Sequence, residues 1–351
     1  MTTGVEFSVV ICTCGRLEGL RVVLEGLAAC EGAREPGWEV VVVDNRPAAE
    51  TETLVRGYEG RLPVRYVPEP VPGSSSARNR GVVASRGETI WYLDDDLKLG
   101  SGWLSAARSA VREQPGSGFY GGRLFADWGN VVFPDWFDKN ECRHASPVSI
   151  AGKYDLGDAP RLLSSEEIAL EANMGVRRGV FAAVGGFRTD MGILPHRPRG
   201  FGEGPDLLVR ARAAGFQGFY VPSASAHHFG DSARIRVGYV LAWAYSMGRR
   251  AQQTKVLHQL RHGGFSSGFR LVEIARAVLR LPASLPLALL GCWFVGKRRR
   301  VGSWMVLSRK LGRLAECFAV TPDLALDWPE GFPRPAKQAK SETGREEGGG
   351  P

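Results

Sequence analysis

Three consecutive carboxylates, at Asp94, Asp95 and Asp96, follow a short apolar run that ends at Leu93. The apolar run predicts a buried strand, and adjacent acids repel one another unless a positive group lies among them. Carboxylate oxygens suit hard cations such as Mg²⁺ and Mn²⁺, and Mg²⁺ is usually held by one or two carboxylates together with substrate phosphates. The stretch therefore favours binding of a metal–phosphate group at a strand end. The alternative is that the acids only cap the helical pattern that begins at Ser101.

A second group of side chains suits phosphate. The stretch 72–81 (Pro-Gly-Ser-Ser-Ser-Ala-Arg-Asn-Arg-Gly) opens a helical pattern with glycine and serines and carries Arg78 and Arg80. Backbone N–H groups at a helix N-terminus and guanidinium groups both bind phosphate oxygens. An ordinary helix start with two surface arginines explains the same residues equally well, so this segment alone does not decide between the two.

Two further acids lie at the start of the last helix predicted before the final strand. In Gly-Glu-Gly-Pro-Asp-Leu (202–207), Pro205 fits the first helical position, which places Glu203 just ahead of the helix and Asp206 in its first turn. The positive end of a helix stabilises an ionised carboxylate, so both residues are expected to be charged at neutral pH. Asp206 also suits a capping role, whereas the longer side chain of Glu203, next to a glycine, has more room to reach a ligand.

Two adjacent histidines, His227 and His228, follow a strand-like segment that ends at Pro222. Successive side chains of a strand point to opposite faces, so at most one of the two can serve a given site. Taken alone, each histidine is expected to lie in the core or at an interface.

The elements that must position these groups alternate between strand and helix. Apolar, β-branched runs predict strands at 7–12, 39–44, 63–67, 88–93, 118–125 and 218–222, and helices are predicted at 17–27, 51–58, 74–84, 101–113, 179–184 and 205–214. Because run 39–44 is apolar on both faces, it is typical of a central parallel strand. The alternation indicates an α/β fold with a Rossmann-like, mostly parallel sheet flanked by helices, in which ligands bind at the carboxyl ends of the strands.

Composition describes a globular protein with an anionic partner. Of 351 residues, 44% are hydrophobic and 23% are charged, which is enough to bury a core. The net charge of +8 suits anionic lipid or a phosphorylated substrate. Nucleic acid is disfavoured, because the basic residues lie largely beside an apolar C-terminal stretch instead of alternating with aromatic residues. The six cysteines lack zinc spacing and are expected to be reduced thiols, and the N-terminus lacks the pattern of a signal peptide, so a cytoplasmic location is expected.

The C-terminal third is helical and basic in pattern. Residues 239–253 predict an amphipathic helix, and the nearly uncharged run 281–296 is followed at once by Lys297-Arg298-Arg299-Arg300. That run is shorter than the ~20 residues that a membrane-spanning helix needs, and it contains two prolines. An interfacial or re-entrant membrane segment is therefore predicted, with a buried helical hairpin as the alternative. Residues 327–351 are rich in proline, glycine and charge and are expected to be disordered.

Together and in this order, these segments resemble a family 2 glycosyltransferase with the GT-A fold. The similar segments are 7–16 (an opening strand and a Thr-Tyr-Asn-Arg turn), 41–45 (a second strand ending in Asp), 76–81 (Ala-Arg-Asn-x-Gly), 93–96 (Asp-x-Asp), and 172–178 with 184–187 (an acceptor-side segment). Cys14 and Gly15 depart from the turn. Gly204 stands where the family has the Asp of a Glu-Asp pair that supplies the catalytic base, which leaves Glu203 or Asp206 for that role. Glu203 is then the preferred base, Asp206 the alternative, and a base outside this segment the third option.

The resemblance implies particular ligands. Asp94 and Asp96 would hold Mg²⁺ or Mn²⁺, and His227 or His228 would complete the metal shell. The nucleotide sugar would be bound by Thr13, Arg16, Asp44, Arg78, Asp94 and Asp95, while Glu203 or Asp206 would take the proton of the acceptor.

The implied reaction is the inverting, hexosyltransferase-like transfer of a sugar from a nucleoside diphosphate sugar, such as a UDP-sugar, to an acceptor hydroxyl in cell-surface polysaccharide or glycolipid assembly. Two other functions fit the same residues: a nucleotidyltransferase, or a nucleotide-sugar-binding protein that lost catalysis at Gly204.

The expected organisation has four parts. These are a nucleotide-sugar-binding half (1–122), an acceptor-binding half (123–232), a helical, membrane-associated extension (233–326) and a disordered tail (327–351). An extension that binds anionic membrane would place the protein on the inner face of the cell membrane, where a lipid-linked acceptor is plausible.

Overall fold

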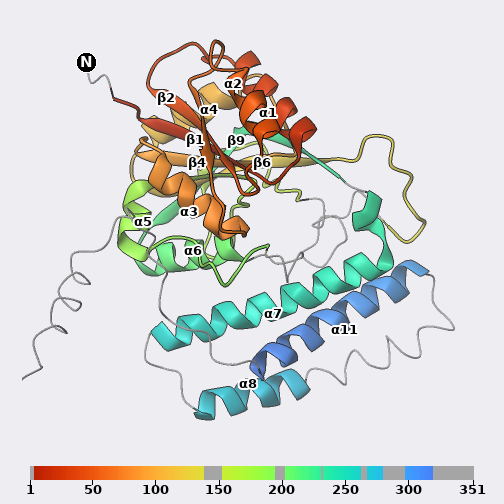
Figure 1. The fold of residues 1–351 in the computed structure, drawn as a ribbon. Helices are drawn as coiled ribbons and strands as arrows, with labels where there is room; N and C mark the ends of the chain where they lie inside the picture. Colours follow the sequence, from red (N-terminus) through yellow and green to blue (C-terminus); the bar gives the residue numbers. More distant parts are fainter. Residues whose placement is uncertain are drawn as a thin grey trace, which may run out of the picture.

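One sheet organises the computed structural model, which describes residues 4–137, 152–193, 202–230, 232–261, 267–279 and 297–318. Its nine described strands are β1 (Phe7–Thr13), β2 (Trp38–Asp44), β3 (Val64–Pro68), β4 (Thr89–Asp94), β5 (Leu97–Leu99), β6 (Ser117–Asp127), β7 (Arg161–Leu162), β8 (Asn173–Arg177) and β9 (Gln217–Phe229). They are ordered β3-β2-β1-β4-β8-β6-β9-β5, and β7 also pairs with β9. Helices flank this sheet, as the sequence predicts (Figure 1).

The first half of the sheet is parallel. β1 pairs in parallel with β2 and with β4, and the register sets Thr13 opposite Asp44 and Cys12 opposite Asp94. β1 and β2 are buried along nearly their whole length, which is the pattern of central strands covered on both faces. The carboxyl ends of β1, β2 and β4 therefore meet at one edge and bring several predicted ligand residues together.

The second half contains strands that the sequence pattern does not predict. β8 lies antiparallel between β4 and β6. β5 has only three residues and pairs antiparallel with the end of β9, with Leu97 opposite His228. Strands this short hold too few residues for an alternating pattern, so their partners define them. The predicted boundary at residue 122 lies within β6, and the sheet joins the two predicted halves.

Six described helices flank the sheet: α1 (Leu17–Ala29), α2 (Ala49–Arg56), α3 (Ser74–Ala84), α4 (Trp103–Glu113), α5 (Arg178–Val184) and α6 (Glu203–Ala213). α6 begins at Glu203, so the predicted start at Pro205 is two residues late. A proline is tolerated there because the N–H groups of a first helical turn have no intrahelical acceptor. α3 lies close to β1 because Gly81 has no side chain; a Cβ there would lie 2.5 Å from Val10 Cγ1.

A single buried amide joins five elements in the core. Asn173, on β8, is fully buried, and its Oδ1 accepts hydrogen bonds from the indole N–H groups of Trp91 (2.8 Å) and Trp103 (3.0 Å). Its Nδ2 donates to the carbonyl groups of Arg123 (3.2 Å) and Ala224 (2.8 Å). These four bonds use the full capacity of an amide and tie β8 to β4, α4, β6 and β9. In the segment that resembles an acceptor-side motif, Asn173 is therefore a core residue.

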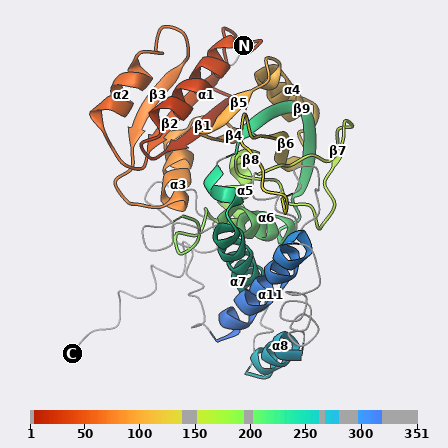
Figure 2. The same cartoon turned by 90° about the vertical axis from the view of Figure 1, so that its right-hand side faces the viewer.

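A layer of three described helices follows the sheet: α7 (Val237–Arg261), α8 (Ser267–Leu279) and α11 (Lys297–Cys317). Figure 2 shows this layer below the sheet, with α7 next to α6. α7 and α11 cross closely because Gly248 and Gly312 have no side chains at the crossing. A Cβ on Gly248 would collide with the Arg309 carbonyl oxygen, and one on Gly312 with that of Tyr245. The helical extension that the sequence predicts is thus present.

Within the described ranges, none of the helices combines the length and apolarity that crossing a membrane requires. The run 281–296 and the tail 327–351 lie outside the described residues.

Candidate active site

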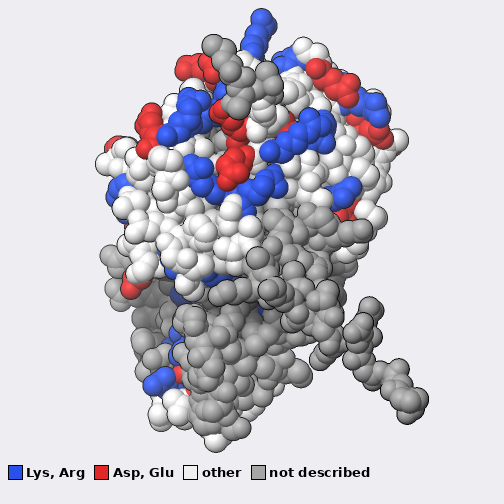
Figure 3. Space-filling view, turned by 90° about the vertical axis from the view of Figure 1, so that its left-hand side faces the viewer, with Lys and Arg blue, Asp and Glu red and all other residues white. Residues whose placement is uncertain are grey.

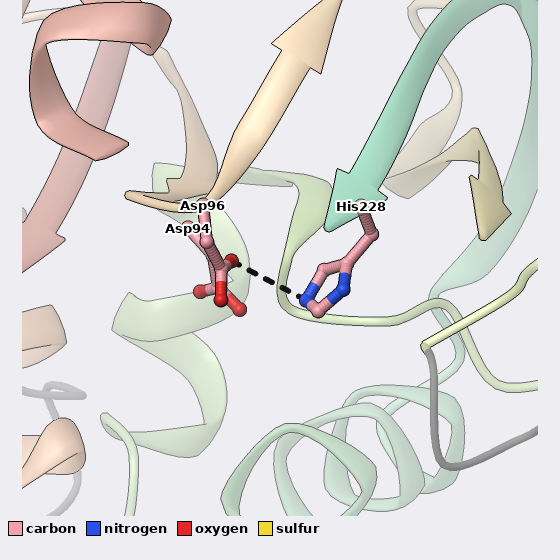
Figure 4. A group of neighbouring side chains, drawn as sticks. All are labelled: Asp94, Asp96 and His228. Carbon is pink, nitrogen blue, oxygen red and sulfur yellow. Dashed lines mark ion pairs between the residues drawn. The ribbon is translucent and has the colours of Figure 1, made fainter. Parts of the chain in front are cut away.

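The acidic triplet joins the end of β4 to β5 and meets a histidine from β9. Ligand atoms of Asp94, Asp96 and His228 all lie within 4.8 Å of one another, and Figure 4 shows the imidazole facing the two carboxylates. His228 Nε2 lies 3.3 Å from Asp96 Oδ1. Because neighbouring side chains of a strand face opposite ways, His227 is exposed and its ring packs on Phe125 at a centroid distance of 5.1 Å. Of the two histidines, the structure brings His228 to the carboxylates.

The donor set of this group suits a divalent metal. Asp96 Oδ1, which faces His228 Nε2, is buried without a hydrogen-bond partner among the described residues. Buried polar atoms normally have partners, so this oxygen points to a ligand. Carboxylate oxygens suit Mg²⁺ and Mn²⁺, and an imidazole nitrogen suits first-row transition ions. The three side chains are a candidate divalent-metal site.

Thr13, Arg16 and Asp95 form a hydrogen-bonded group beside the metal ligands. Thr13 Oγ1 donates to Asp95 Oδ2 (2.6 Å), and Arg16 Nη1 donates to Asp95 Oδ1 (3.0 Å) and Asp96 Oδ2 (2.8 Å). Burial raises the pKa of Asp95 to about 6, against the opposing effects of Arg16 and the Thr13 hydrogen bond. The Arg16 side chain is 52% exposed, so its guanidinium is accessible to an anionic ligand next to the metal group.

Asp44 lies at the end of β2 but is fully buried. Its Oδ1 accepts a hydrogen bond from the backbone N–H of Arg46 (3.0 Å), and its Oδ2 accepts bonds from the N–H of Ala48 (3.1 Å) and the hydroxyl of Tyr66 (3.2 Å). These contacts fix the turn into α2. As the sequence predicts, Asp44 lies at the edge of the sheet where the parallel strands end, but its carboxylate faces the protein interior.

Arg78 connects the metal group with a second acidic group. Its Nη2 lies 3.5 Å from Asp94 Oδ1, and its Nη1 donates to Glu203 Oε1 at 2.6 Å. Ser74 Oγ donates to the same Glu203 oxygen at 2.7 Å, and Glu203 itself is 3% exposed. The other arginine of this segment, Arg80, is exposed. Of the two arginines that the sequence singles out, Arg78 belongs to the site.

A residue that the sequence pattern does not single out completes this second group. Glu171 Oε1 accepts a hydrogen bond from the backbone N–H of Gly204 at 2.8 Å. Its carboxyl group fills the space that a residue-204 side chain would enter, since a Cβ on Gly204 would collide with Glu171 Cδ. Burial and the negative charge of Glu203 raise the pKa of Glu171, and Arg78 opposes this. The sequence shows that residue 204 is a glycine, but only the fold shows that the Glu171 side chain fills the space beside it.

Asp206 faces the protein interior. It is 1% exposed, and its Oδ2 accepts a hydrogen bond at 2.8 Å from Arg210, one turn later in α6. Arg210 also donates to the carbonyl groups of Val184 and Gly186 at the end of α5. The pair therefore joins α6 to α5.

Comparison with known proteins agrees with this geometry. The family model for glycosyl transferase family 2 matches residues 8–180. The succinoglycan biosynthesis protein ExoM of Rhizobium meliloti is 26% identical over 258 residues, which cover 72% of this chain and 75% of ExoM. The uncharacterized protein y4gI of Sinorhizobium fredii is 28% identical over 247 residues, covering 65% of this chain but only 25% of y4gI, so the chain spans about a quarter of that relative's length.

Among solved structures, the chain is similar to the mannosyltransferase PcManGT from Pyrobaculum calidifontis in complex with GDP-Man and Mn²⁺. The TM-score is 0.52 at 18% sequence identity, and the match covers 90% of this chain and 87% of that one. At this identity the likeness concerns the fold, which is the GT-A arrangement that the sequence predicts. With the family match over β1 to the start of α5, and the acidic triplet within it, residues 8–180 of the chain belong to glycosyl transferase family 2.

Proposed function

We propose that the chain transfers a hexose from a nucleoside diphosphate sugar to an acceptor hydroxyl, with inversion at the anomeric carbon. The observation that carries this proposal is the joining of two acidic groups by Arg78. One group, Asp94 with Asp96 and His228, suits a metal–diphosphate; the other, Glu171 with Glu203, suits a proton acceptor. Sugar transfer needs both properties in one site.

The proposed donor side uses the first group. Asp94, Asp96 and His228 would hold Mg²⁺ or Mn²⁺, and such an ion, when bound, neutralises the charge of the leaving diphosphate. Arg16, beside these carboxylates and half exposed, would contact a donor phosphate. PcManGT was solved with GDP-Man and Mn²⁺, which supports a nucleotide sugar and this class of ion.

Thr13, Asp95 and Asp44 would act on the donor by shaping the nucleotide pocket. Thr13 and Asp95 hydrogen-bond one another across β1 and the β4–β5 connection, and Asp44 fixes the turn after β2. These contacts keep the strand ends rigid, so that a nucleotide would meet a preformed surface.

On the acceptor side, inversion in a single displacement requires a base opposite the leaving group. The acceptor oxygen forms its bond to the anomeric carbon while the bond to the diphosphate breaks, and the hydroxyl proton passes to a carboxylate. The acidic residues around the start of α6 would supply that carboxylate.

Incubation with a panel of UDP-sugars and GDP-mannose in the presence of Mn²⁺ is expected to raise the unfolding midpoint with one donor in particular. A ligand at 100 times its Kd stabilises the folded state by about 2.7 kcal/mol, which thermal unfolding detects. With a panel of lipid-linked and free saccharide acceptors, that donor should release its nucleoside diphosphate. Release of pyrophosphate would instead identify a nucleotidyltransferase, and binding without turnover would identify a binding protein.

We also propose that the acceptor lies at the cytoplasmic membrane surface. On one face of the described sheet region, acidic and basic side chains are interspersed (Figure 3). The helical layer has a different character, since α8 exposes Leu271, Val272, Val278 and Leu279. Exposed apolar side chains near Lys and Arg favour an interfacial position on anionic lipid. ExoM, named for succinoglycan biosynthesis, supports a role in polysaccharide assembly.

The full chain should float with liposomes that contain anionic lipid, and less of it should float at high salt. The double variant Leu271→Glu/Leu279→Glu should reduce the floating fraction, because these side chains are 67% and 76% exposed. Leu162→Glu on β7, where the side chain is 52% exposed, is the matched control and should float as the parent does. Equal recovery of all three proteins in the soluble fraction would contradict membrane binding.

A further inference from the structure

We propose that Glu171 is the general base of this enzyme and that Glu203 is a positioning residue. This inference rests on the proposed sugar transfer. The base must touch the acceptor hydroxyl and must gain a proton as the new bond forms. Three acidic residues, Glu171, Glu203 and Asp206, surround the start of α6, and their surroundings differ.

Asp206 forms a buried ion pair that stabilises the packing of α6. Its ion pair with Arg210 is nearly fully buried, with side-chain exposures of 2% and 4%. Removing such a carboxylate from its partner would leave a buried guanidinium uncompensated, so Asp206 is held in place.

Glu203 is held by two donors on one oxygen. Arg78 and Ser74 both bind Oε1, at 2.6 and 2.7 Å, and the side chain is 4% exposed. The loop at Gly192 closes over it, since a Cβ on Gly192 would lie 2.8 Å from the same oxygen. An acceptor that approached Oε1 would have to displace these contacts, and Oε2 is enclosed by the protein, with no hydrogen-bond partner among the described residues. A Glu203 carboxylate held in this way suits a fixed negative charge that orients Arg78 toward Asp94.

Glu171 is the partly exposed member of the three. It makes no ion pair with any residue in the described part of the chain, and the Gly204 N–H fixes one of its oxygens at 2.8 Å. The Glu171 carboxyl group fits here because it occupies the space that a side chain at position 204 would fill. The backbone of Glu171 also adjoins the metal group, as the carbonyl of the next residue, Ala172, accepts a hydrogen bond from the Asp94 N–H.

The charges around Glu171 suit proton uptake. The charged groups that act on it are Glu203 from α6 and Arg78 from α3. Since the ion pair with Arg78 stabilises a negative charge on Glu203, a second negative charge on Glu171 is disfavoured. Burial and this repulsion raise the pKa of Glu171. A carboxylate with a raised pKa takes a proton more readily than an ordinary one.

In the proposed step the acceptor oxygen attacks the anomeric carbon, and the carbon–oxygen bond to the diphosphate breaks with its electron pair. The acceptor proton moves to the carboxylate of Glu171. The products are the glycoside, the nucleoside diphosphate and a protonated Glu171, which then releases its proton to solvent.

The first test uses the donor and acceptor that the full-length enzyme turns over fastest. Glu171→Gln should lower kcat by about 10²–10⁴-fold, while the donor with Mn²⁺ still raises the unfolding midpoint. Glu203→Gln should lose less, and its kcat–pH profile should retain an acid limb displaced to lower pH, because the charge that raises the pKa of Glu171 is gone. Near-parental turnover by Glu171→Gln, with loss of turnover in Glu203→Gln, would overturn the proposal. A parent enzyme that is inactive on every donor would instead overturn the proposed function.

The second test moves the carboxylate. Gly204→Ala should displace Glu171 and lower turnover, whereas Gly179→Ala, at a helical glycine with open space around it, should leave turnover unchanged. Gly204→Asp combined with Glu171→Ala places a carboxylate on the other side of the same space. This double variant should recover turnover relative to Glu171→Ala alone. If Gly204→Ala keeps full turnover, or the double variant is no better than Glu171→Ala, the assignment of Glu171 is wrong.

Discussion

Asp96→Asn is expected to lower the rate of sugar transfer by about 10³-fold or more, since a metal ion contributes several kcal/mol to stabilising a leaving diphosphate. Asp96 contributes the buried Oδ1 that faces His228, and an amide in its place would be a weaker, neutral ligand. The fold should persist, because an Asn oxygen can still accept the Arg16 hydrogen bond. Turnover at saturating donor, with Mn²⁺ or Mg²⁺ added after chelation, measures the effect.

A readout independent of turnover comes from unfolding. Mn²⁺ should raise the unfolding midpoint of the parent enzyme and have a smaller effect on Asp96→Asn, since an ion that binds the folded state must stabilise it. Asp158→Asn is a suitable control, because this carboxylate is 93% exposed and pairs with Arg123 at the surface. Full turnover in EDTA would show that Asp94, Asp96 and His228 do not hold a required ion.

Asn173→Leu is expected to destabilise the protein by about 3–5 kcal/mol, the upper range for single substitutions. Leucine has a similar size but leaves the indole N–H groups of Trp91 and Trp103 and two backbone carbonyl groups without their partner. Each buried polar group left unsatisfied costs about 1–3 kcal/mol, partly relieved by local rearrangement. Urea unfolding followed by tryptophan fluorescence measures the loss directly.

Gln217→Ala provides the comparison for loss of an amide. Gln217 is exposed at the start of β9, and its removal should change the free energy of unfolding by no more than about 0.5 kcal/mol. If Asn173→Leu is as stable as this control, the four hydrogen bonds of Asn173 do not support the core.

Sequence patterns predict the parallel half of the sheet well because its strands are continuous. The runs at 39–44 and 88–93 are nearly continuous apolar stretches, as in strands buried on both faces, and they appear as β2 and β4. β5 and β8 lack such runs, because β5 has only three residues and β8 reads Asn-Met-Gly-Val-Arg. The role of Asn173 follows from the pairing of β8 with its neighbours, so no local pattern predicts it.

The candidate site divides in the same way. Asp94, Asp96 and Arg78 could be named from the sequence because each stands at the end of a strand or the start of a helix, where α/β sheets place ligands. Choosing His228 over His227 needed the register of β9 against β5. Glu171 occupies the space left by the missing side chain of Gly204, which lies more than thirty residues later in the sequence, in α6. Only the folded structure shows which side chain fills that space.

The two-residue connection between β4 and β5 has a consequence for how the protein folds. In the sheet, β4 and β5 are separated by β8, β6 and β9, although only Asp95 and Asp96 separate them in the sequence. The strands therefore form a ring, and it closes only when β9 pairs with β5, across a chain loop of roughly 130 residues whose closure entropy must be overcome. A nascent chain that ends before β9 carries two acidic ligands but no imidazole. If Asp94, Asp96 and His228 hold an ion, we expect tight metal binding only in a chain whose ring has closed, so that metal binding depends on the completion of folding.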